Sequence, residues 1–557
     1  MHSNYSEDGQ YTPHELIQMG KEKGMKIMAL SDHNTIIGVK EMIEAGKAED
    51  IQIIPAIECS TVYRGMDVHL LGYGIDINYP YFVQLPDLLK KNSYTQFLKR
   101  CDKMNEVYGL SLDGEKLWKE CDGKAAWFTL CQAAFHDPKA KDIEDFQDYL
   151  PGGKRCNPAP VNFYWDKCQE GSPLRIPSTN PTLEDSIREI HNAGGLAFIA
   201  HPFNNFDHKE DYLQEVIDMG IDGIEAYSNY HTEKQNEFYE QYCLDHHLLI
   251  SCGSDFHGNK KPSIIMGEYG LKKDGSTYIK DICRKLALKD IKVVLCDIDG
   301  TLYNWSRTLT NETIEVINKL HEQGIEFGLA SGRPYEELVK YAESWGFDYQ
   351  FDAIIGLNGA EVWDCHSNIN HEYYQLSTDL LKEIIELMSQ FTCNPFMYWN
   401  QKLLCINHDA MITKSAKTSQ REVVVAKDIS ELYAQPNAKI MFRMEESEVK
   451  KVEKYLEAHP SNEYVGFKTQ STLIEFMDPR ISKGFGIDKY CEITGIQPNQ
   501  ILSFGDTTND NSMLERCGWS VCLIDGTDDT KAISKDITEY SCADSGFARY
   551  MNKYFFK

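Results

Sequence analysis

The chain of 557 residues has few of the features that mark membrane, secreted or nucleic-acid-binding proteins. No apolar run approaches the roughly 20 residues that a membrane-spanning helix needs, so we expect no membrane association. The N-terminus, Met1-His2-Ser3-Asn4, lacks the basic and then apolar order of a signal peptide. We therefore expect a cytoplasmic protein, in which the 17 cysteines, none in a Cys-x-x-Cys pair, are mostly reduced and buried rather than bound to zinc.

Basic residues are also scarce. The chain has 57 Lys and Arg against 85 Asp and Glu, which gives a formal net charge of −28. Because the binding of long nucleic acids depends on neutralising phosphates with cations, this charge disfavours such partners. It does not exclude small phosphorylated substrates that metal ions help to hold.

The length is too great for a single hydrophobic core, and we expect two large domains, residues 1–290 and 291–557. In the first, short apolar strands alternate with helical stretches, which predicts a parallel sheet or barrel. Residues of about 78–177 interrupt this alternation, and we interpret them as an inserted helical cap. The expected strands are Lys26–Leu30, Gln52–Pro55, Val68–Gly72, Leu196–Ala200, Gly223–Ala226 and Leu248–Cys252.

The second domain opens with an apolar strand that leads from Ile291 to Asp297. Strands and helices then alternate again, and Thr310–Gln323 is expected to form an amphipathic helix. Residues of about 365–472 form a second, strand-rich insertion. The pattern predicts an α/β domain with a parallel sheet and an inserted cap.

Two carboxylates follow the first strand of this domain, in Asp297-Ile298-Asp299-Gly300-Thr301-Leu302. The carboxyl edge of a parallel sheet is where such folds place their sites. One carboxylate can attack phosphorus, and the other can protonate the leaving oxygen and then activate water. Gly300 permits the tight turn between them.

Two further strand ends and one lysine carry matching chemistry. Ser331-Gly332-Arg333 can hold a phosphoryl oxygen through a hydroxyl and backbone N–H groups. The acidic loop Gly505-Asp506-Thr507-Thr508-Asn509-Asp510 is suited to Mg²⁺. Lys483 supplies a cation that can neutralise nucleophile and phosphate. Each piece alone is common in proteins without such a site, and it is their order that indicates one.

Together these motifs resemble the haloacid dehalogenase (HAD) superfamily, in particular its Cof-like members with a large cap, over residues of about 291–557. The resemblance implies a Rossmann-like domain and a phosphatase that forms an aspartyl phosphate. Asp297 matches the nucleophile, Asp299 the general acid/base, and Ser331 and Lys483 the residues that bind and neutralise the phosphate. The implied substrate contacts are Ser331, Gly332, Arg333 and Asn358. The implied Mg²⁺ ligands are Asp297, Asp299 through its backbone carbonyl, and Asp506, with Asn509 and Asp510 as supporting partners.

Histidines and carboxylates recur near the expected strand ends of the first domain. A single histidine beside a strand is usually a hydrogen-bonded core residue, so the argument depends on their co-occurrence. Mixed imidazole and carboxylate ligands at the ends of parallel strands suit Mn²⁺, Zn²⁺ or Fe²⁺. The candidate ligands are His2, Asp8, His33, Glu58, His69, His201, Asp255 and His257.

This pattern resembles the PHP (polymerase and histidinol phosphatase) family over residues of about 1–77 and 178–290. The matching segments include His2-Ser3-x-x-Ser6-Glu7-Asp8-Gly9, Ser31-Asp32-His33 and Gly253-Ser254-Asp255-Phe256-His257. The resemblance implies a distorted (β/α)7 barrel that holds two or three divalent metals. One metal would use His2, Glu58 and Asp255, a second Asp8, His33 and His201, and a third Glu58, His69 and His257.

One departure from the family pattern affects the expected metal site. The family opens with His-x-His, whereas here Met1-His2 supplies only the second histidine. Two explanations stay open: the sequence begins late, so that Met1 is the residue between two histidines, or the first metal lacks a ligand.

We expect a bifunctional phosphoesterase. The PHP half would hydrolyse a phosphomonoester or phosphodiester, such as a nucleoside 3′,5′-bisphosphate or a short oligoribonucleotide. The HAD half would dephosphorylate a small metabolite, such as a sugar phosphate or a phosphorylated cofactor. In the alternative hypothesis only the HAD half is catalytic, and the PHP half is a binding or regulatory module. A further hypothesis has the two halves act in turn on one substrate.

Overall fold

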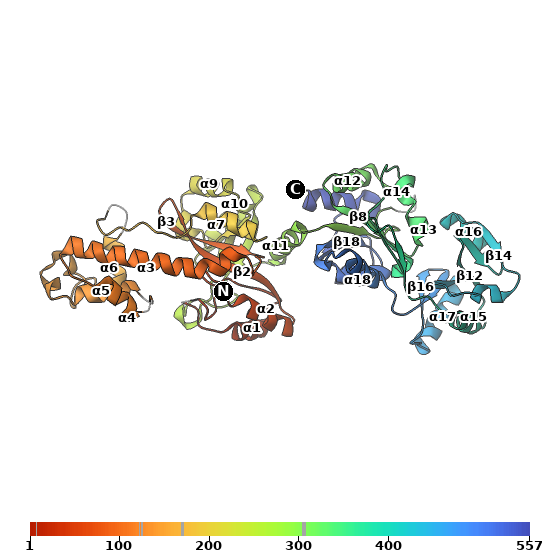
Figure 1. Cartoon of the computed structure of the whole chain (residues 1–557), viewed down its shortest axis with the longest axis horizontal. Coiled ribbons are helices and arrows are strands. Elements are labelled where there is room, and N and C mark those ends of the chain that lie inside the picture. The colour runs from red at the N-terminus through yellow and green to blue at the C-terminus, as the bar shows by residue number, and fades with distance from the viewer. Residues whose placement is uncertain (7, 122, 124–125, 169–171, 304–307, 557) are drawn as a thin grey trace. The chain divides into compact units, whose positions relative to one another are not determined.

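The computed structural model describes residues 1–556 except 7, 122, 124–125, 169–171 and 304–307 (Figure 1). The chain divides into two compact units, Met1–Leu286 and Ala287–Lys557. Glu7, part of the first histidine motif, lies outside the described residues. Among the helices that the structure describes, none is both long and apolar enough to cross a bilayer.

A six-stranded sheet forms the centre of the N-terminal unit, with its strands in sequence order. β1 pairs with β2 in parallel, as do β4 with β5 and β5 with β6. β3 runs antiparallel to both of its neighbours. The strands are β1 (Ile27–Leu30), β2 (Gln52–Tyr63), β3 (Met66–Tyr73), β4 (Leu196–Ile199), β5 (Gly223–Ser228) and β6 (Leu249–Gly253).

The second and third strands are longer than their apolar cores suggested, and they form a hairpin. Arg64 and Gly65 connect them, with φ of 49° and 77°. Left-handed backbone at both positions is what a tight hairpin turn requires. Glu58 therefore lies inside β2 rather than beyond its end, and it faces Leu71 of β3 across the ladder.

The family resemblance implied a barrel of seven strands, whereas the described residues form six, in the six places where the residue pattern predicted strands. No ladder among the described pairings joins β6 to β1; Met1 and His2 bridge them instead. The N–H of Ser31 donates to the carbonyl of Met1 at 3.0 Å, and the N–H of His2 donates to that of Phe256 at 2.9 Å. A cavity of about 810 Å³ lies beside Met1 and is lined by residues of both edge strands. The α/β class of the unit is as predicted.

Helices flank this sheet and bury its apolar side chains. Thr12 and Glu15 form a capping box at the start of α1 (Pro13–Glu22). The other flanking helices are α2 (Val39–Ala48), α7 (Leu183–Asn192), α8 (Phe203–Phe206), α9 (Glu210–Asp218), α10 (Glu233–Asp245) and α11 (Ser276–Lys289).

The insertion in the N-terminal unit is helical, as predicted. Its first helix, α3 (Pro80–Tyr108), places Phe82 in the core beside the sheet and Phe97 in a separate core within the insertion. The residue pattern predicts a helix only over Thr95–Val107, but the helix begins at Pro80 and continues through Pro86. The remaining α-helices are α4 (Gly114–Cys121), α5 (Ala126–Phe135) and α6 (Ala159–Lys167).

An eight-stranded sheet forms the core of the C-terminal unit, in the order β11-β10-β9-β8-β7-β18-β19-β20. The strands from β9 to β20 in this order are parallel, and β10 and β11 are antiparallel, which confirms the predicted parallel α/β core. The strands are β7 (Val293–Cys296), β8 (Glu326–Ala330), β9 (Ala353–Gly356), β10 (Glu361–Asp364), β11 (Asn370–Glu372), β18 (Ile501–Gly505), β19 (Trp519–Cys522) and β20 (Asp536–Ile537).

The strand-rich insertion forms a second sheet in this unit, of six strands with helices α15 (Thr378–Met388), α16 (Ala410–Ser419) and α17 (Glu446–Ala458). We expected the insertion to end near residue 472, but β17 pairs with β15 and extends this sheet to Met477. The strands are β12 (Asn394–Trp399), β13 (Lys402–Cys405), β14 (Val423–Val425), β15 (Lys439–Arg443), β16 (Val465–Gln470) and β17 (Leu473–Met477). Below, the cap means residues 378–477.

Candidate active sites

Three adjacent parallel strands bring the motifs of the C-terminal unit to one edge of its sheet. Asp297 follows β7, Ser331 follows β8, and Asp506 follows β18. β7 pairs directly with both of the other strands. The N–H of Asp297 also donates to the carbonyl of Phe504 at 2.9 Å, which extends the ladder to the site.

Lys483 lies between two of the carboxylates at this edge. It is buried at the start of α18 (Lys483–Thr494), and its Nζ lies 2.5 Å from an oxygen of Asp297 and 2.5 Å from one of Asp510. Carboxylate oxygens of Asp297, Asp506 and Asp510 lie within 4.8 Å of one another. Burial and the charge of Asp510 raise the pKa of Asp297 well above its usual range, although Lys483 opposes the shift. Burial and the same neighbour raise the pKa of Asp506 to about 7.

Local backbone geometry allows this crowding of carboxylates. Gly300 has φ of 98°, and a Cβ on it would lie 2.3 Å from a carboxylate oxygen of Asp506, so no larger residue fits. The Thr301 hydroxyl donates to Asp506 at 3.1 Å. The second oxygen of Asp510 accepts the N–H groups of Asp506 and Thr507 at 2.9 and 3.1 Å, which fixes the acidic loop.

Two of the expected ligands lie apart from this carboxylate cluster. The Asp299 carboxylate is held by Arg333, whose Nη2 lies 2.8 Å away, and its side chain is 55% exposed. The Asn509 side chain accepts the Thr507 hydroxyl at 2.6 Å and is also exposed. The contacts of these two side chains with Arg333 and Thr507 are a feature that motif spacing does not reveal.

The expected phosphate contacts lie beside one another. Ser331 is buried, and its carbonyl accepts the N–H of Asn358 at 2.9 Å. Asn358 has φ of 56°, and its buried Oδ1 has no hydrogen-bond partner among the described residues. A Cβ on Gly332 would lie 3.2 Å from that oxygen. The site therefore presents the Ser331 hydroxyl and an uncommitted amide oxygen next to the Gly332 backbone.

In the N-terminal unit, Glu58 is the centre of the histidine cluster. Its carboxylate lies 2.7 Å from His69, 3.2 Å from His2 and 3.3 Å from His201. Burial opposes ionisation of Glu58, but the surrounding imidazoles, His33 foremost, hold its pKa well below the usual range. His2 also lies 2.9 Å from Asp255, so His2, Glu58 and Asp255 form one compact group.

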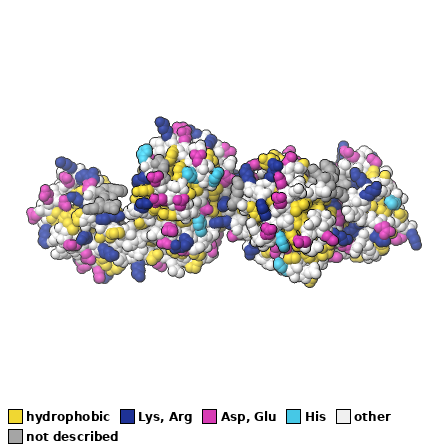
Figure 2. All heavy atoms as spheres, turned by 90° about the horizontal axis from the view of Figure 1, so that it is seen from above, with side chains coloured by type: hydrophobic (Ala, Val, Ile, Leu, Met, Phe, Trp, Pro, Cys, Tyr) yellow, Lys and Arg dark blue, Asp and Glu magenta, His cyan; other side chains and the backbone are white. Residues whose placement is uncertain are grey.

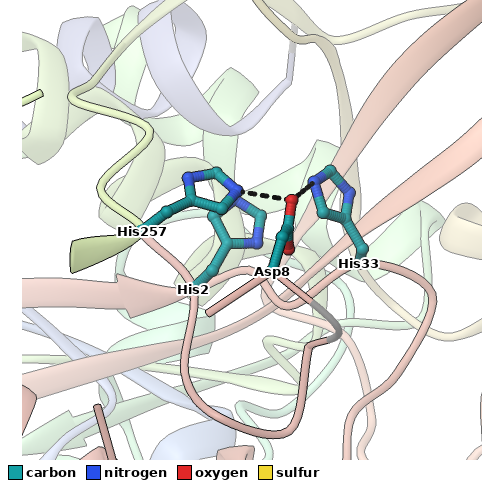
Figure 3. Close-up of side chains that lie close together, drawn as sticks. All are labelled: His2, Asp8, His33 and His257. Atoms are coloured by element: carbon teal, nitrogen blue, oxygen red, sulfur yellow. Dashed lines mark ion pairs between the residues drawn. The ribbon is translucent and has the colours of Figure 1, made fainter. Parts of the chain in front are cut away.

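Asp8 is the centre of a second group (Figure 3). One of its carboxylate oxygens lies 3.0 Å from His257 and 3.6 Å from His33. The rings of His2 and His257 are stacked with centroids 4.0 Å apart, and ligand atoms of all four residues lie within 4.8 Å of one another. Figure 3 shows the four side chains converging from separate segments of the chain.

The structure brings all eight candidate ligands together and contains the expected group of His2, Glu58 and Asp255, but it groups other ligands differently from the expectation. His257 joins Asp8 rather than Glu58 and His69, and His201 joins Glu58 rather than Asp8 and His33. The donor set fits divalent metals such as Mn²⁺, Zn²⁺ or Fe²⁺. Two buried ring nitrogens without a hydrogen-bond partner among the described residues support this fit, His2 Nδ1 and His33 Nδ1.

Glu225 is a site residue that the sequence analysis missed. It lies on β5 and is buried, and its Oε2 accepts the N–H of His201 at 2.9 Å. Burial raises its pKa to about 7. A Cβ on Gly253 would lie 1.9 Å from its other oxygen, so Gly253 leaves room for it. A carboxylate within an otherwise apolar buried strand was the available signal, because such a group needs a specific partner.

Tyr230 and Lys261 were also missed. The Tyr230 hydroxyl donates to Asp255 at 2.6 Å, and Lys261 Nζ lies 2.9 Å from the same oxygen. Asp32 accepts both the N–H and the hydroxyl of Ser3 at 2.5 and 2.6 Å. It thereby fixes the segment that carries His2.

Three cations of the helical insertion contact other residues of the insertion. Arg155 pairs with Asp166 at 2.8 Å, and Lys167 pairs with Asp145 at 2.5 Å. The Arg100 guanidinium lies over the rings of Trp127 and Tyr164. These contacts support the interpretation of these cations as structural rather than phosphate-binding.

Family models match both units. A model of haloacid dehalogenase-like hydrolases matches residues 294–551, and a model of the PHP domain matches residues 1–124. The two matches place a PHP-like segment and a haloacid dehalogenase-like hydrolase segment in one chain. The predicted resemblance to these two families is thereby confirmed, and the chain is a hydrolase.

Relatives with curated names each match about half of this chain. A 5′-3′ exoribonuclease of Haemophilus influenzae is 29% identical over 262 residues, which cover 46% of this chain and 88% of the relative. A 5-amino-6-(5-phospho-D-ribitylamino)uracil phosphatase of Bacillus subtilis is 24% identical over 269 residues, 47% of this chain and 97% of the relative. A 3′,5′-nucleoside bisphosphate phosphatase of Chromobacterium violaceum is 26% identical over 295 residues, which cover 51% of this chain and 93% of the relative.

Proposed function

We propose that this PHP–HAD chain hydrolyses phosphate esters at two separate sites. The observation that carries the proposal for the HAD unit is the position of Lys483, between the carboxylates of Asp297 and Asp510 at the carboxyl edge of a parallel sheet. A buried ammonium ion among clustered carboxylates suits the transfer of a dianionic phosphoryl group. It neutralises the nucleophile and the phosphate together.

In the HAD unit, Asp297 attacks phosphorus and forms an aspartyl phosphate, and the bond to the leaving oxygen breaks. Asp299 gives that oxygen a proton and then takes one from the attacking water. Arg333 holds the Asp299 carboxylate until substrate enters, and the Ser331 hydroxyl donates to a phosphoryl oxygen. When bound at Asp297, Asp506 and Asp510, Mg²⁺ supplies charge that stabilises the transition state.

In the PHP unit, the imidazoles around Glu58 and Asp8 would hold the metals. Such metals, when bound, supply a hydroxide nucleophile near neutral pH and clamp a phosphate. Glu225 fixes the backbone of His201, and Asp32 fixes the segment that carries His2. Lys261, beside Asp255, offers a cation to a phosphoryl oxygen.

The names of the relatives support a substrate class for each site. An exoribonuclease and a nucleoside bisphosphate phosphatase support a nucleotide or short oligoribonucleotide for the PHP unit. The phosphatase of a phosphoribityl compound supports a small phosphorylated metabolite for the HAD unit. On the face drawn in Figure 2, described Lys and Arg side chains are interspersed with Asp and Glu, which does not favour a long nucleic acid.

The test is phosphate release from a panel of sugar phosphates, nucleotides and nucleoside bisphosphates, with Mg²⁺ and with Mn²⁺. Wild type is compared with Asp297→Asn and His201→Ala. We expect each variant to lose a different subset of substrates. If only Asp297→Asn loses activity, the PHP unit is a binding or regulatory module. If Asp297→Asn retains substantial Mg²⁺-dependent turnover, the HAD assignment is wrong.

A further inference from the structure

A cavity of about 410 Å³ lies between the core of the HAD unit and its cap. Its volume is in the range of small-molecule sites. The core contributes Tyr303, Glu337 and Tyr341, and the cap contributes Gln401 and Arg421. Tyr303 forms a β-bridge with Asp299, and Glu337 pairs with Arg333, which holds the Asp299 carboxylate. The cavity therefore adjoins the proposed acid/base, on the side where a leaving group would extend.

Arg421 is a buried cap residue of this cavity whose hydrogen-bonding capacity is only partly used. Its side chain is only 6% exposed, and its buried Nε has no hydrogen-bond partner among the described residues. The other two nitrogens lie 3.5 and 3.4 Å from one oxygen of Glu336. A guanidinium carries five N–H donors in a planar fork, so a buried one with two long contacts is incompletely satisfied.

The orientation of Arg421 is nevertheless fixed. Its guanidinium lies over the ring of Tyr398, 4.7 Å from the centroid. Lys439, which also lies near that ring, is committed elsewhere: its Nζ lies 2.8 Å from Glu475 and donates to the carbonyl of Gly332 at 2.9 Å. Arg421 is thus a positioned cation with free donors. Lys439, in contrast, links the cap to the segment Ser331-Gly332-Arg333, where phosphate is expected to bind.

Glu336 is a weak partner that a ligand can displace. Its side chain is 44% exposed, so release into water costs little, and its contacts to Arg421 are longer than those of a good charge-assisted hydrogen bond. Lys340 is exposed and lines the same cavity. A second anionic group that enters here would meet two cations, one of them held in place.

We propose that Arg421 binds a second anionic group, a carboxylate or a phosphate, on the leaving-group side of the HAD substrate. The preferred substrate is then a small phosphate ester with two anionic ends. One end is placed at Asp297 and the other is held by the guanidinium fork. This inference rests on the proposed phosphatase function of the HAD unit.

The test compares three compounds on one sugar frame: glucose 6-phosphate, 6-phosphogluconate and glucose 1,6-bisphosphate. Kinetics are measured on the full chain with Mg²⁺, for wild type, Arg421→Met and Arg421→Lys. We expect wild type to favour the doubly anionic compounds.

Arg421→Met should raise their KM by about 30-fold or more, change kcat little, and leave the KM of glucose 6-phosphate within about twofold. For the doubly anionic compounds, the KM of Arg421→Lys should lie between those of wild type and Arg421→Met, because lysine keeps the charge but lacks the planar fork of donors. A preference for one of the two charged compounds assigns the group as carboxylate or phosphate.

The control is Lys450→Met, which removes an exposed cap lysine that pairs with Glu446 at 3.6 Å on α17, away from the cavity. If Arg421→Met does not fold, Glu336→Ala gives the opposite readout, since loss of the competing carboxylate should lower the KM of the charged compounds. Calorimetric binding of the three compounds to Asp297→Asn separates this inference from the proposed catalysis. Equal affinity for all three, or an equal loss for all three in Arg421→Met, overturns the inference. Turnover that survives in Asp297→Asn overturns the catalytic proposal instead.

Discussion

The Nζ of Lys483 lies 2.5 Å from Oδ1 of Asp297, at a position where the lysine side chain has no exposed surface. The same nitrogen contacts Asp510, whose side chain is equally buried. One cation therefore offsets the repulsion between two buried carboxylates. Burial disfavours the charged form of Lys483, but these two neighbours outweigh it and raise its pKa.

Removal of this cation is the first prediction. Lys483→Met leaves Asp297 and Asp510 buried without a counter-charge, and breaking a buried pair costs about 3–5 kcal/mol. We expect a loss of that size in the free energy of urea unfolding without Mg²⁺, and a smaller loss with Mg²⁺. Lys489→Met, on the same helix, removes an ion pair with the exposed Glu492 and should change stability by less than about 0.5 kcal/mol. Equal effects of the two substitutions would contradict this account.

Removal of the central carboxylate of the PHP cluster is the second prediction. Glu58→Gln keeps the shape of the side chain but removes the charge that three imidazoles contact. We expect Mn²⁺ affinity, measured by titration calorimetry on the full chain, to fall by about 100-fold or more, since even indirect support of a ligand contributes about 10–100-fold. HAD-dependent phosphate release should not change. His191→Gln, whose partner Asp222 lies outside the cluster, is the matched control. Unchanged Mn²⁺ affinity in Glu58→Gln would rule out a metal at Glu58.

The residues that the sequence located best are those that directly follow parallel strands. Asp297, Ser331 and Asp506 each follow an apolar strand, and parallel strands end at one edge, so strand prediction alone brought them together. Gly300 was likewise predictable, because two acidic residues on one tight turn require left-handed backbone between them. The α/β class of both units followed from the same alternation.

The grouping of the histidines was not predictable, because it depends on backbone conformations that spacing does not encode. His201 and Asp255 have φ of 28° and 50°, unusual for residues with a Cβ, and these angles decide which neighbour each side chain meets. The hairpin that places Glu58 inside a strand was hidden by the polar residues of β2. The length of α3 was missed because Pro86 predicts a helix break that tertiary packing overrides.

The contact between Glu225 and His201 leads to the third prediction. Glu225 accepts the N–H of His201 and thereby supports its strained backbone. Glu225→Ala leaves this N–H without its acceptor, and we expect Mn²⁺ affinity of the PHP unit to fall by about 10–100-fold. Glu225→Gln keeps an acceptor oxygen and should retain most of the affinity. A similar loss in both variants would show that the charge of Glu225, rather than the hydrogen bond, matters. No loss in either would remove Glu225 from the site.

The fourth prediction concerns pH and Glu361, which begins β10 in the HAD unit. Its Oε2 accepts the N–H of Tyr335 at 2.6 Å. Burial, followed by the charges of Glu372 and Glu336, raises its pKa from 4.5 to about 7. The folded chain therefore binds a proton here that the unfolded chain releases above about pH 4.5. Stability from this group is present below that pH, is lost as pH rises to about 7, and changes no further above it.

Glu361→Gln cannot titrate, so its free energy of unfolding relative to wild type should rise by about 2 kcal/mol between pH 5 and 7.5. Urea unfolding across that range measures the difference, and a difference that stays constant with pH would show that Glu361 has an ordinary pKa in the folded chain.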